Sequence, residues 1–308
     1  MRPAPNMLRA WLTLVALSVK RQARFRQMVG IALGLLVMVT LFVGVNSYFD
    51  RWNFGRLRVR PYRETLNTHL VRLSQQQAMV GRVPEASAVH WGIIGSVGAA
   101  LENSGFLMLS RWIVFATFQA FLLPIWTLSF ATDAIGQERE QRTLIWLFTR
   151  PLPRWSIYLA KWLAALPWCL GLNVGGFALI CYAGGEPGRL AFRTYWPAVF
   201  AGTFAFSALF HLMAAAFRRP AIVALLYSFF FETLVGDLPG DLKRLSISFY
   251  IRSLMYAATQ GMNISPDALT VYAPVRPPIA WAVLLGSTVV FTLVGMWVFS
   301  RQEYEDDL

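Results

Sequence analysis

The 308-residue sequence has few charges: 14% of its residues are Asp, Glu, Lys or Arg, whereas 56% are hydrophobic. A soluble domain of this size cannot bury so much apolar surface, and a disordered chain needs far more charge. Two cysteines are too few for a disulfide-stabilised fold, and three scattered histidines form no metal-binding pattern. The composition therefore indicates a membrane protein with several spans.

The sequence also lacks any Gly-Lys dipeptide, and so it lacks a phosphate-binding loop of the G-x-x-x-x-G-K-[ST] type. We expect the chain itself to bind no nucleotide, metal or other cofactor, and to have no catalytic residues. An intramembrane enzyme stays open as a minor alternative. It needs a nucleophile with a base or paired aspartates at membrane depth, and the spans offer only the isolated His211 and Glu232.

Six apolar stretches are long enough, or nearly so, to cross about 30 Å of hydrocarbon as helices. They cover residues 28–47, 106–131, 157–184, 196–217, 221–235 and 279–300. The second contains Pro124, which predicts a kink because proline removes one backbone donor. We therefore expect an all-α polytopic membrane protein whose transmembrane domain covers residues 28–308.

Residues 1–27 form a separate N-terminal segment. Its apolar stretch Met7–Val19 is followed by the cations Lys20, Arg21, Arg24 and Arg26. These cations and the missing cleavage site disfavour a signal peptide and favour a helix lying in the membrane interface. The net charge of +12 is then best explained by anionic lipid rather than by nucleic acid.

The distribution of cations favours both termini on the cytoplasmic side. Per residue, the segments on that side are richer in Lys and Arg than the long loops on the other side, which cross regardless of charge. The expected outer segments are a loop at 49–105 and amphipathic helices at 237–278. The expected cytoplasmic connection between spans two and three is residues 132–156.

This cytoplasmic connection has the most informative pattern. Glu138 and Arg142 have the i, i+4 spacing of a helical ion pair, and Leu144, Leu147 and Phe148 give the same helix an apolar side. Pro151 and Pro153 end this helix. On the next helix one face presents three polar residues at the membrane boundary: Arg154, Tyr158 and Lys161. Taken alone, the segment is also compatible with a simple solvated loop.

The segment resembles a loop of the permease subunits of ABC-2 type ATP-binding-cassette transporters. The resemblance rests on the glutamate-rich turn, Thr143-Leu144, Thr149-Arg150-Pro151, and the spacing Arg154-x-x-x-Tyr158-x-x-Lys161. A second stretch, from Phe231-Glu232 through Leu238-Pro239-Gly240 to Tyr250-Ile251-Arg252, is similar to the link between the last two spans of that family. The expected plan is the same: an N-terminal elbow helix, six spans and the ABC-2 permease fold.

The resemblance implies that residues 132–156 contain a coupling helix that docks on a separate ATPase. The docking candidates are Glu138, Glu140, Arg142, Leu144, Leu147 and Phe148, and the membrane-boundary candidates are Arg150, Arg154, Tyr158 and Lys161. It further implies an exporter of type V in the inner membrane of a prokaryote, with two P-loop ATPase subunits that bind ATP and Mg, and a second copy or a homologous permease. A membrane scaffold or maturation factor that binds an ATPase without transporting stays open as an alternative.

Two polar residues within or at the ends of the spans have two interpretations each. Glu232 is either a cation or substrate contact in the outer part of a path, or a hydrogen-bond anchor for the outer helices. His211 is either a proton site or a histidine that is hydrogen-bonded across helices. The sequence favours the structural interpretation for both.

Overall fold

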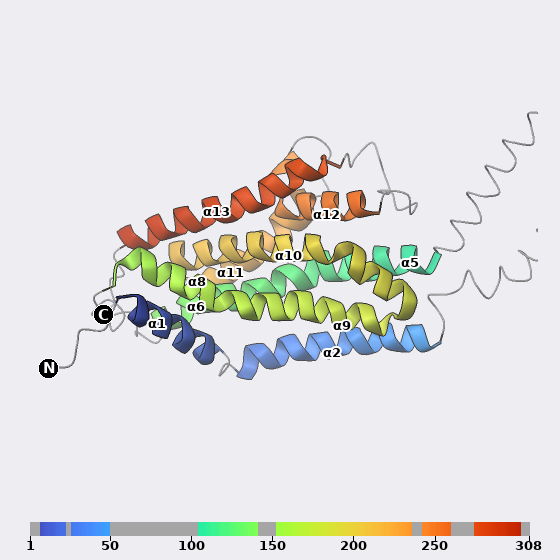
Figure 1. Ribbon diagram of the computed structural model, residues 1–308, viewed down its shortest axis with the longest axis horizontal. Coiled ribbons are helices and arrows are strands. Elements are labelled where there is room, and N and C mark those ends of the chain that lie inside the picture. Colours follow the sequence, from blue (N-terminus) through green and yellow to red (C-terminus); the bar gives the residue numbers. More distant parts are fainter. Residues whose placement is uncertain are drawn as a thin grey trace, which may run out of the picture.

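The computed structural model describes residues 7–22, 26–49, 104–140, 152–235, 242–259 and 274–302, and every regular element in these ranges is a helix. The helices form one elongated bundle, and both chain termini lie at the same end of it (Figure 1). We call this end the termini end and the other the opposite end. The expected all-α architecture is confirmed.

The described helices account for one short N-terminal helix, six long apolar segments and one short pair near the opposite end. The N-terminal helix is α1 (Met7–Gln22). The long segments are α2 (Arg26–Tyr48); α5, η2 and α6 (Ser104–Leu109, Ser110–Leu122, Leu123–Glu140); α8, η3 and α9 (Arg154–Leu170, Gly171–Gly175, Gly176–Ala183); α10 (Gly185–Ala216); α11 and η4 (Pro220–Leu226, Tyr227–Val235); and α13 (Pro277–Arg301). The short pair is the 3₁₀ helix η5 (Leu242–Leu245) and α12 (Ile247–Ala258).

Five of these segments are long and apolar enough to cross a membrane, and the α11–η4 segment is a shorter apolar helix. Two boundaries differ from the expected ones. The α6 helix continues to Glu140, so residues 132–140 are helix rather than loop, because the buried Ile135 keeps this part packed. The α10 helix begins at Gly185 instead of 196. Its first turns can contain Arg189 and Arg193 because both side chains are exposed there.

Pro124 lies two residues after the π-helical segment η2. The thirteen residues of η2 form π-helix, in which Thr117 Oγ1 donates to the carbonyl of Trp112 five residues earlier at 2.8 Å. A π turn changes the backbone pairing of a helix locally, and such turns are a recognised cause of irregularity. The irregular part of this span therefore lies before the proline, whereas the sequence predicts a kink at Pro124 itself.

The α10 helix is the centre of the bundle. It packs against α6, α8, α9, α12 and α13, and it is the most buried of the five long spans. The main core contains large aromatic side chains that are fully buried, among them Phe118, Trp126, Phe177, Phe206 and Phe210. By contrast, α2 and α13 lie at the sides of the bundle and expose apolar faces, as is expected of helices that contact lipid.

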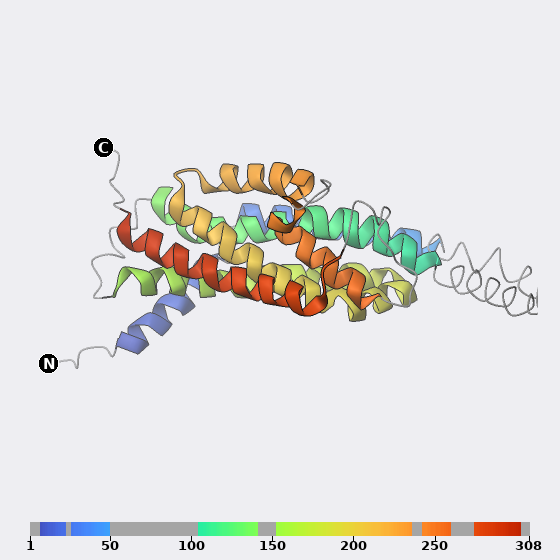
Figure 2. The same ribbon diagram turned by 90° about the horizontal axis from the view of Figure 1, so that it is seen from above.

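The α12 helix differs in its placement from the expectation for residues 237–278. We expect an amphipathic helix resting on the outer interface, but α12 packs against α10 and α13 near the opposite end (Figures 1 and 2). Its residues Phe249, Ile251 and Met255 are almost completely buried. The helix is therefore part of the bundle core rather than a surface element.

Candidate functional site

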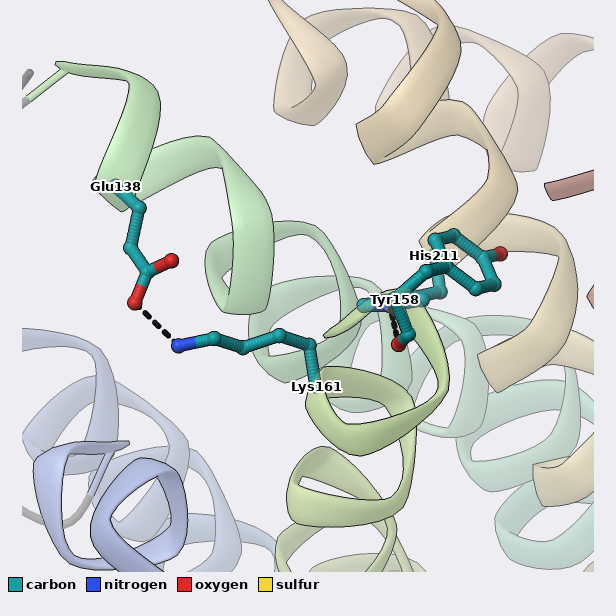
Figure 3. A network of polar contacts seen from close by, with 4 residues as sticks. All are labelled: Glu138, Tyr158, Lys161 and His211. Atoms are coloured by element: carbon teal, nitrogen blue, oxygen red, sulfur yellow. Dashed lines mark hydrogen bonds and ion pairs between the residues drawn. The ribbon is translucent and has the colours of Figure 1, made fainter. Parts of the chain in front are cut away.

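A buried ion pair joins α6 to α8 at the termini end. The ammonium group of Lys161, two turns into α8, donates to the carboxylate of Glu138 in the last turn of α6 (Figure 3). Glu138 is 3% exposed and Lys161 is 5% exposed. The pair therefore holds together α6 and α8, the two helices that the 141–151 connection joins.

This placement changes the roles expected for both residues. Glu138 is expected to be a surface contact for a partner, yet so little of it is exposed that it has hardly any surface to offer. Lys161 is expected at the membrane boundary, but it points inward to the carboxylate. The side chain of Glu140 is outside the description, as are five predicted residues: Arg142, Leu144, Leu147, Phe148 and Arg150.

Tyr158 is also buried rather than placed at the boundary. It has no exposed surface, and its ring lies 4.6 Å from the ring of His211, centroid to centroid. Its hydroxyl lies against Gly295 of α13, where even one added methyl group would collide with it. Of the expected boundary residues that the structure describes, only Arg154 is exposed, and it donates to the carbonyl of Ser300 at 3.4 Å. This face of α8 therefore turns toward the bundle.

His211, which is completely buried near the end of α10, links three helices. Its Nδ1 lies 3.1 Å from the carbonyl oxygen of Ala131 in α6, and its Nε2 lies 3.3 Å from that of Tyr158 in α8 (Figure 3). A neutral imidazole donates to one of these carbonyls, and the tautomer decides which. The contacts are those of a histidine bonded across helices. Among the described residues, no group of His, Cys, Asp and Glu could hold a metal ion.

Glu232 is the centre of a second polar site, near the opposite end. It is 2% exposed and accepts four hydrogen bonds. They come from Tyr227 Oη at 2.7 Å, Ser246 Oγ at 2.6 Å, Ile247 N at 3.1 Å and Ser248 N at 2.8 Å. The carboxylate thus joins the η4 segment to the beginning of α12.

These hydrogen bonds satisfy the N-terminus of α12. The first backbone N–H groups of a helix have no partner within the helix, and burying them unpaired is costly. Glu232 accepts from the first two, while the hydroxyl of Ser246 accepts from Phe249 N at 3.3 Å. The negative carboxylate also lies at the positive end of the helix dipole. The geometry is that of an anchor which allows a helix to begin inside the bundle.

A comparison with protein families agrees with this architecture. A sequence model of the ABC-2 family transporter proteins matches residues 62–304. The chain belongs to this family. No curated protein matches it significantly. The chain is therefore the multi-pass membrane component of an ABC-2 type transporter.

Sequence reasoning missed some of the polar contacts that position α12 in this ABC-2 protein. Arg252 Nε donates to Gln119 Oε1 of η2 at 3.0 Å, across 133 positions of sequence. Neither residue has a sequence pattern that predicts the partner. The helix start at Ser246 did carry a signal, because serine is a preferred residue before the first turn of a helix.

Removing the Glu232 carboxylate should destabilise the ABC-2 protein. We expect Glu232→Ala to lower the free energy of unfolding by about 3 kcal/mol, because buried N–H groups of α12 lose a charged acceptor. Glu232→Gln keeps one acceptor oxygen and should have a smaller effect. Thermal melting of the solubilised protein measures both, with Thr194→Ala as control, because Thr194 lies on α10 and makes only an exposed hydrogen bond within its own helix. Equal melting temperatures for Glu232→Ala and the control would contradict the anchor role.

Proposed function

We propose that this chain is the membrane-spanning permease subunit of an ATP-binding-cassette exporter, driven by two separate ATPase subunits that dock on residues 141–151. Members of the ABC-2 family work with separate ABC ATPases. The observation that carries the proposal is the ion pair between Glu138, in the last turn of α6, and Lys161, two turns into α8, which joins the two helices that this connection links. A partner that moves this connection would therefore move both spans together.

The docking surface in this proposal begins after Glu138. Since Glu138 is buried, the remaining candidates are Glu140 and Arg142 as polar contacts, with Leu144, Leu147 and Phe148 as the apolar insert. Closure of the ATPase pair on ATP and Mg would displace this insert, and α6 and α8 would rock as rigid levers. The termini end is then the cytoplasmic side, and a second copy or a homologous permease completes the path.

Packing inside the bundle supports a lever rather than a local hinge. Beside the ion pair, Tyr158 of α8 packs against Phe299 of α13 as well as His211 of α10, with ring centroids 5.9 Å apart for the first contact. Ile135 of α6 belongs to the same buried cluster. Because packed interiors transmit displacement rather than absorb it, movement of α8 reaches α10 and α13.

An ATPase pull-down tests the docking site. We expect Leu147→Glu with Phe148→Glu to reduce co-purification of the ATPase at least about tenfold, because two carboxylates enter an apolar contact. The matched control is Leu242→Glu, an exposed leucine near the opposite end. If the double variant inserts into the membrane and still retains the ATPase at the control level, this docking site is wrong.

A further inference from the structure

The N-terminal helix α1 has two different faces. On one face Leu14 and Ser18 are each 5% exposed and pack toward α8. The other side of the helix is exposed: Leu8 and Leu12 lie on one flank and Leu17 on the other, at 70%, 50% and 57% exposure, with Arg9 and Lys20 between them. The helix lies oblique to the spans at the termini end (Figures 1 and 2). A short helix beside the first span, with leucines and cations on its exposed side, is placed to lie at the surface of a membrane.

Charge identifies the kind of surface that this face fits. Up to Phe49 the chain contains no acidic residue, and the first one is Asp50. The cations of the same stretch are Arg2, Arg9, Lys20, Arg21, Arg24 and Arg26. Arg9 and Lys20 are exposed on α1 itself. Apolar side chains together with cations and no acid complement an anionic lipid leaflet. The short distance along the chain from Gln22 to Arg26, where α2 begins, keeps α1 at that leaflet.

Two indole groups connect α1 to the span that carries the 141–151 connection. Trp11 Nε1 donates to the carbonyl of Ser156 in the first turn of α8 at 2.9 Å. Trp168 Nε1, near the end of α8, donates to the carbonyl of Val19 in α1 at 3.2 Å. These bonds lie on either side of Lys161, the partner of Glu138. A displacement of α1 therefore acts on the same helix that holds the base of the connection.

We propose that α1 is a sensor of anionic lipid that regulates the transporter: its exposed face binds the charged leaflet, and Trp11 and Trp168 transmit its position to α8. The regulatory part rests on the proposed function, because it acts through the ATPase docked on the connection. Anionic lipid binds α1 better when the helix lies in the leaflet than when it has left it. Because α1 is bonded to α8, this preference also favours the position of α8 that goes with the membrane-bound α1.

The first experiment measures where α1 lies, without any ATPase. The full chain with Leu12→Cys carries a spin label in liposomes of phosphatidylcholine, with or without about one quarter phosphatidylglycerol. Labelling is selective because the natural Cys169 and Cys181 are buried. We expect phosphatidylglycerol to move the label deeper, and Arg9→Gln with Lys20→Gln to weaken this response about fivefold for each cation removed. The sensor is overturned if phosphatidylglycerol does not change the label depth. It is also overturned if the two substitutions do not weaken that change.

The second experiment measures regulation in the complex with the ATPase. We expect phosphatidylglycerol to change the rate of ATP hydrolysis severalfold, and Arg9→Gln with Lys20→Gln to abolish the change. Trp11→Phe with Trp168→Phe keeps an aromatic ring at each position but removes both N–H donors. In this variant the label depth should stay the same, but phosphatidylglycerol should no longer change the rate of ATP hydrolysis. The single Trp168→Phe variant should lose part of that change in rate.

The outcomes separate the two proposals. A complex that hydrolyses ATP equally in both lipids, or a Trp11→Phe/Trp168→Phe variant with a full lipid response, overturns the regulatory link but leaves the permease function intact. If no ATPase associates with the chain, the proposed function fails instead, and the label depth still decides whether α1 binds anionic lipid. A response to an acidic soluble protein in place of lipid also overturns the sensor.

Discussion

A Lys161→Met variant is expected to lose about 3–5 kcal/mol of unfolding free energy. Methionine keeps much of the length of the side chain, so the main change is that the buried carboxylate of Glu138 loses its cation. That carboxylate is then a buried charge without its cation, which costs stability. Thermal or denaturant unfolding of the solubilised protein measures the loss.

Partner variants show whether the loss comes from the pair. Adding Glu138→Leu to Lys161→Met should recover most of the stability, because an apolar pair leaves no unpaired charge in the core. Exchanging the two residues, with Glu138→Lys and Lys161→Glu, should recover less stability than the apolar pair. The contacts around each position fit the original side chain. If the single and double variants are equally unstable, the charge of Glu138 is not what Lys161 stabilises.

The same variants separate stability from coupling under the proposed function. The apolar pair should be stable, yet it lacks the directional bond that holds α6 and α8 together. We therefore expect substrate transported per ATP hydrolysed to fall in Glu138→Leu/Lys161→Met at normal melting temperature. Full coupling in that variant would mean that the ion pair only stabilises the fold.

A Gly188→Ala variant is expected to lose about 3 kcal/mol or more, and much of the protein should fail to fold. The turn between α9 and α10 brings Gly188 directly onto the backbone of Cys181, so an added methyl group would collide with its carbonyl oxygen. Backbone atoms cannot move aside as a flexible side chain does. The neighbouring Gly185 has a φ of +70°, which further restricts how the turn can adapt.

Gly286→Ala is the matched control for this variant. Gly286 lies within α13, and a methyl group placed there meets no atom within 4 Å. Alanine also favours helix over glycine, so this change should be neutral or slightly stabilising. Yield of monodisperse protein and melting temperature compare the two variants. Equal behaviour would show that the turn has room that the structure does not provide.

The sequence predicted the architecture well because lipid imposes a simple rule on composition. Spans must be long, helical and apolar, so the six segments were found with their order and approximate ends. The prediction was least accurate for span ends near charged residues. The expected fourth span begins at residue 196, whereas α10 already begins at Gly185 and continues through the exposed Arg189 and Arg193.

The candidate site was predicted less well, and the reason is geometrical. The spacing of Tyr158 and Lys161 correctly puts both on neighbouring turns of one helix, but spacing does not tell which way that face turns. Here it turns inward, because Tyr158 fits against Gly295 and Lys161 meets Glu138. Both partners come from other helices.

By itself, the sequence determined that this protein is an all-helical membrane component with the loop pattern of the ABC-2 family. Hydrophobic length and residue order are local properties, and they can be read along the chain. Only the tertiary structure decided that Glu138 pairs with Lys161, that Glu232 caps α12 and that α1 is bonded to α8. Each of these contacts joins different segments of the chain, and a buried polar group takes whichever partner the packing brings within hydrogen-bond distance.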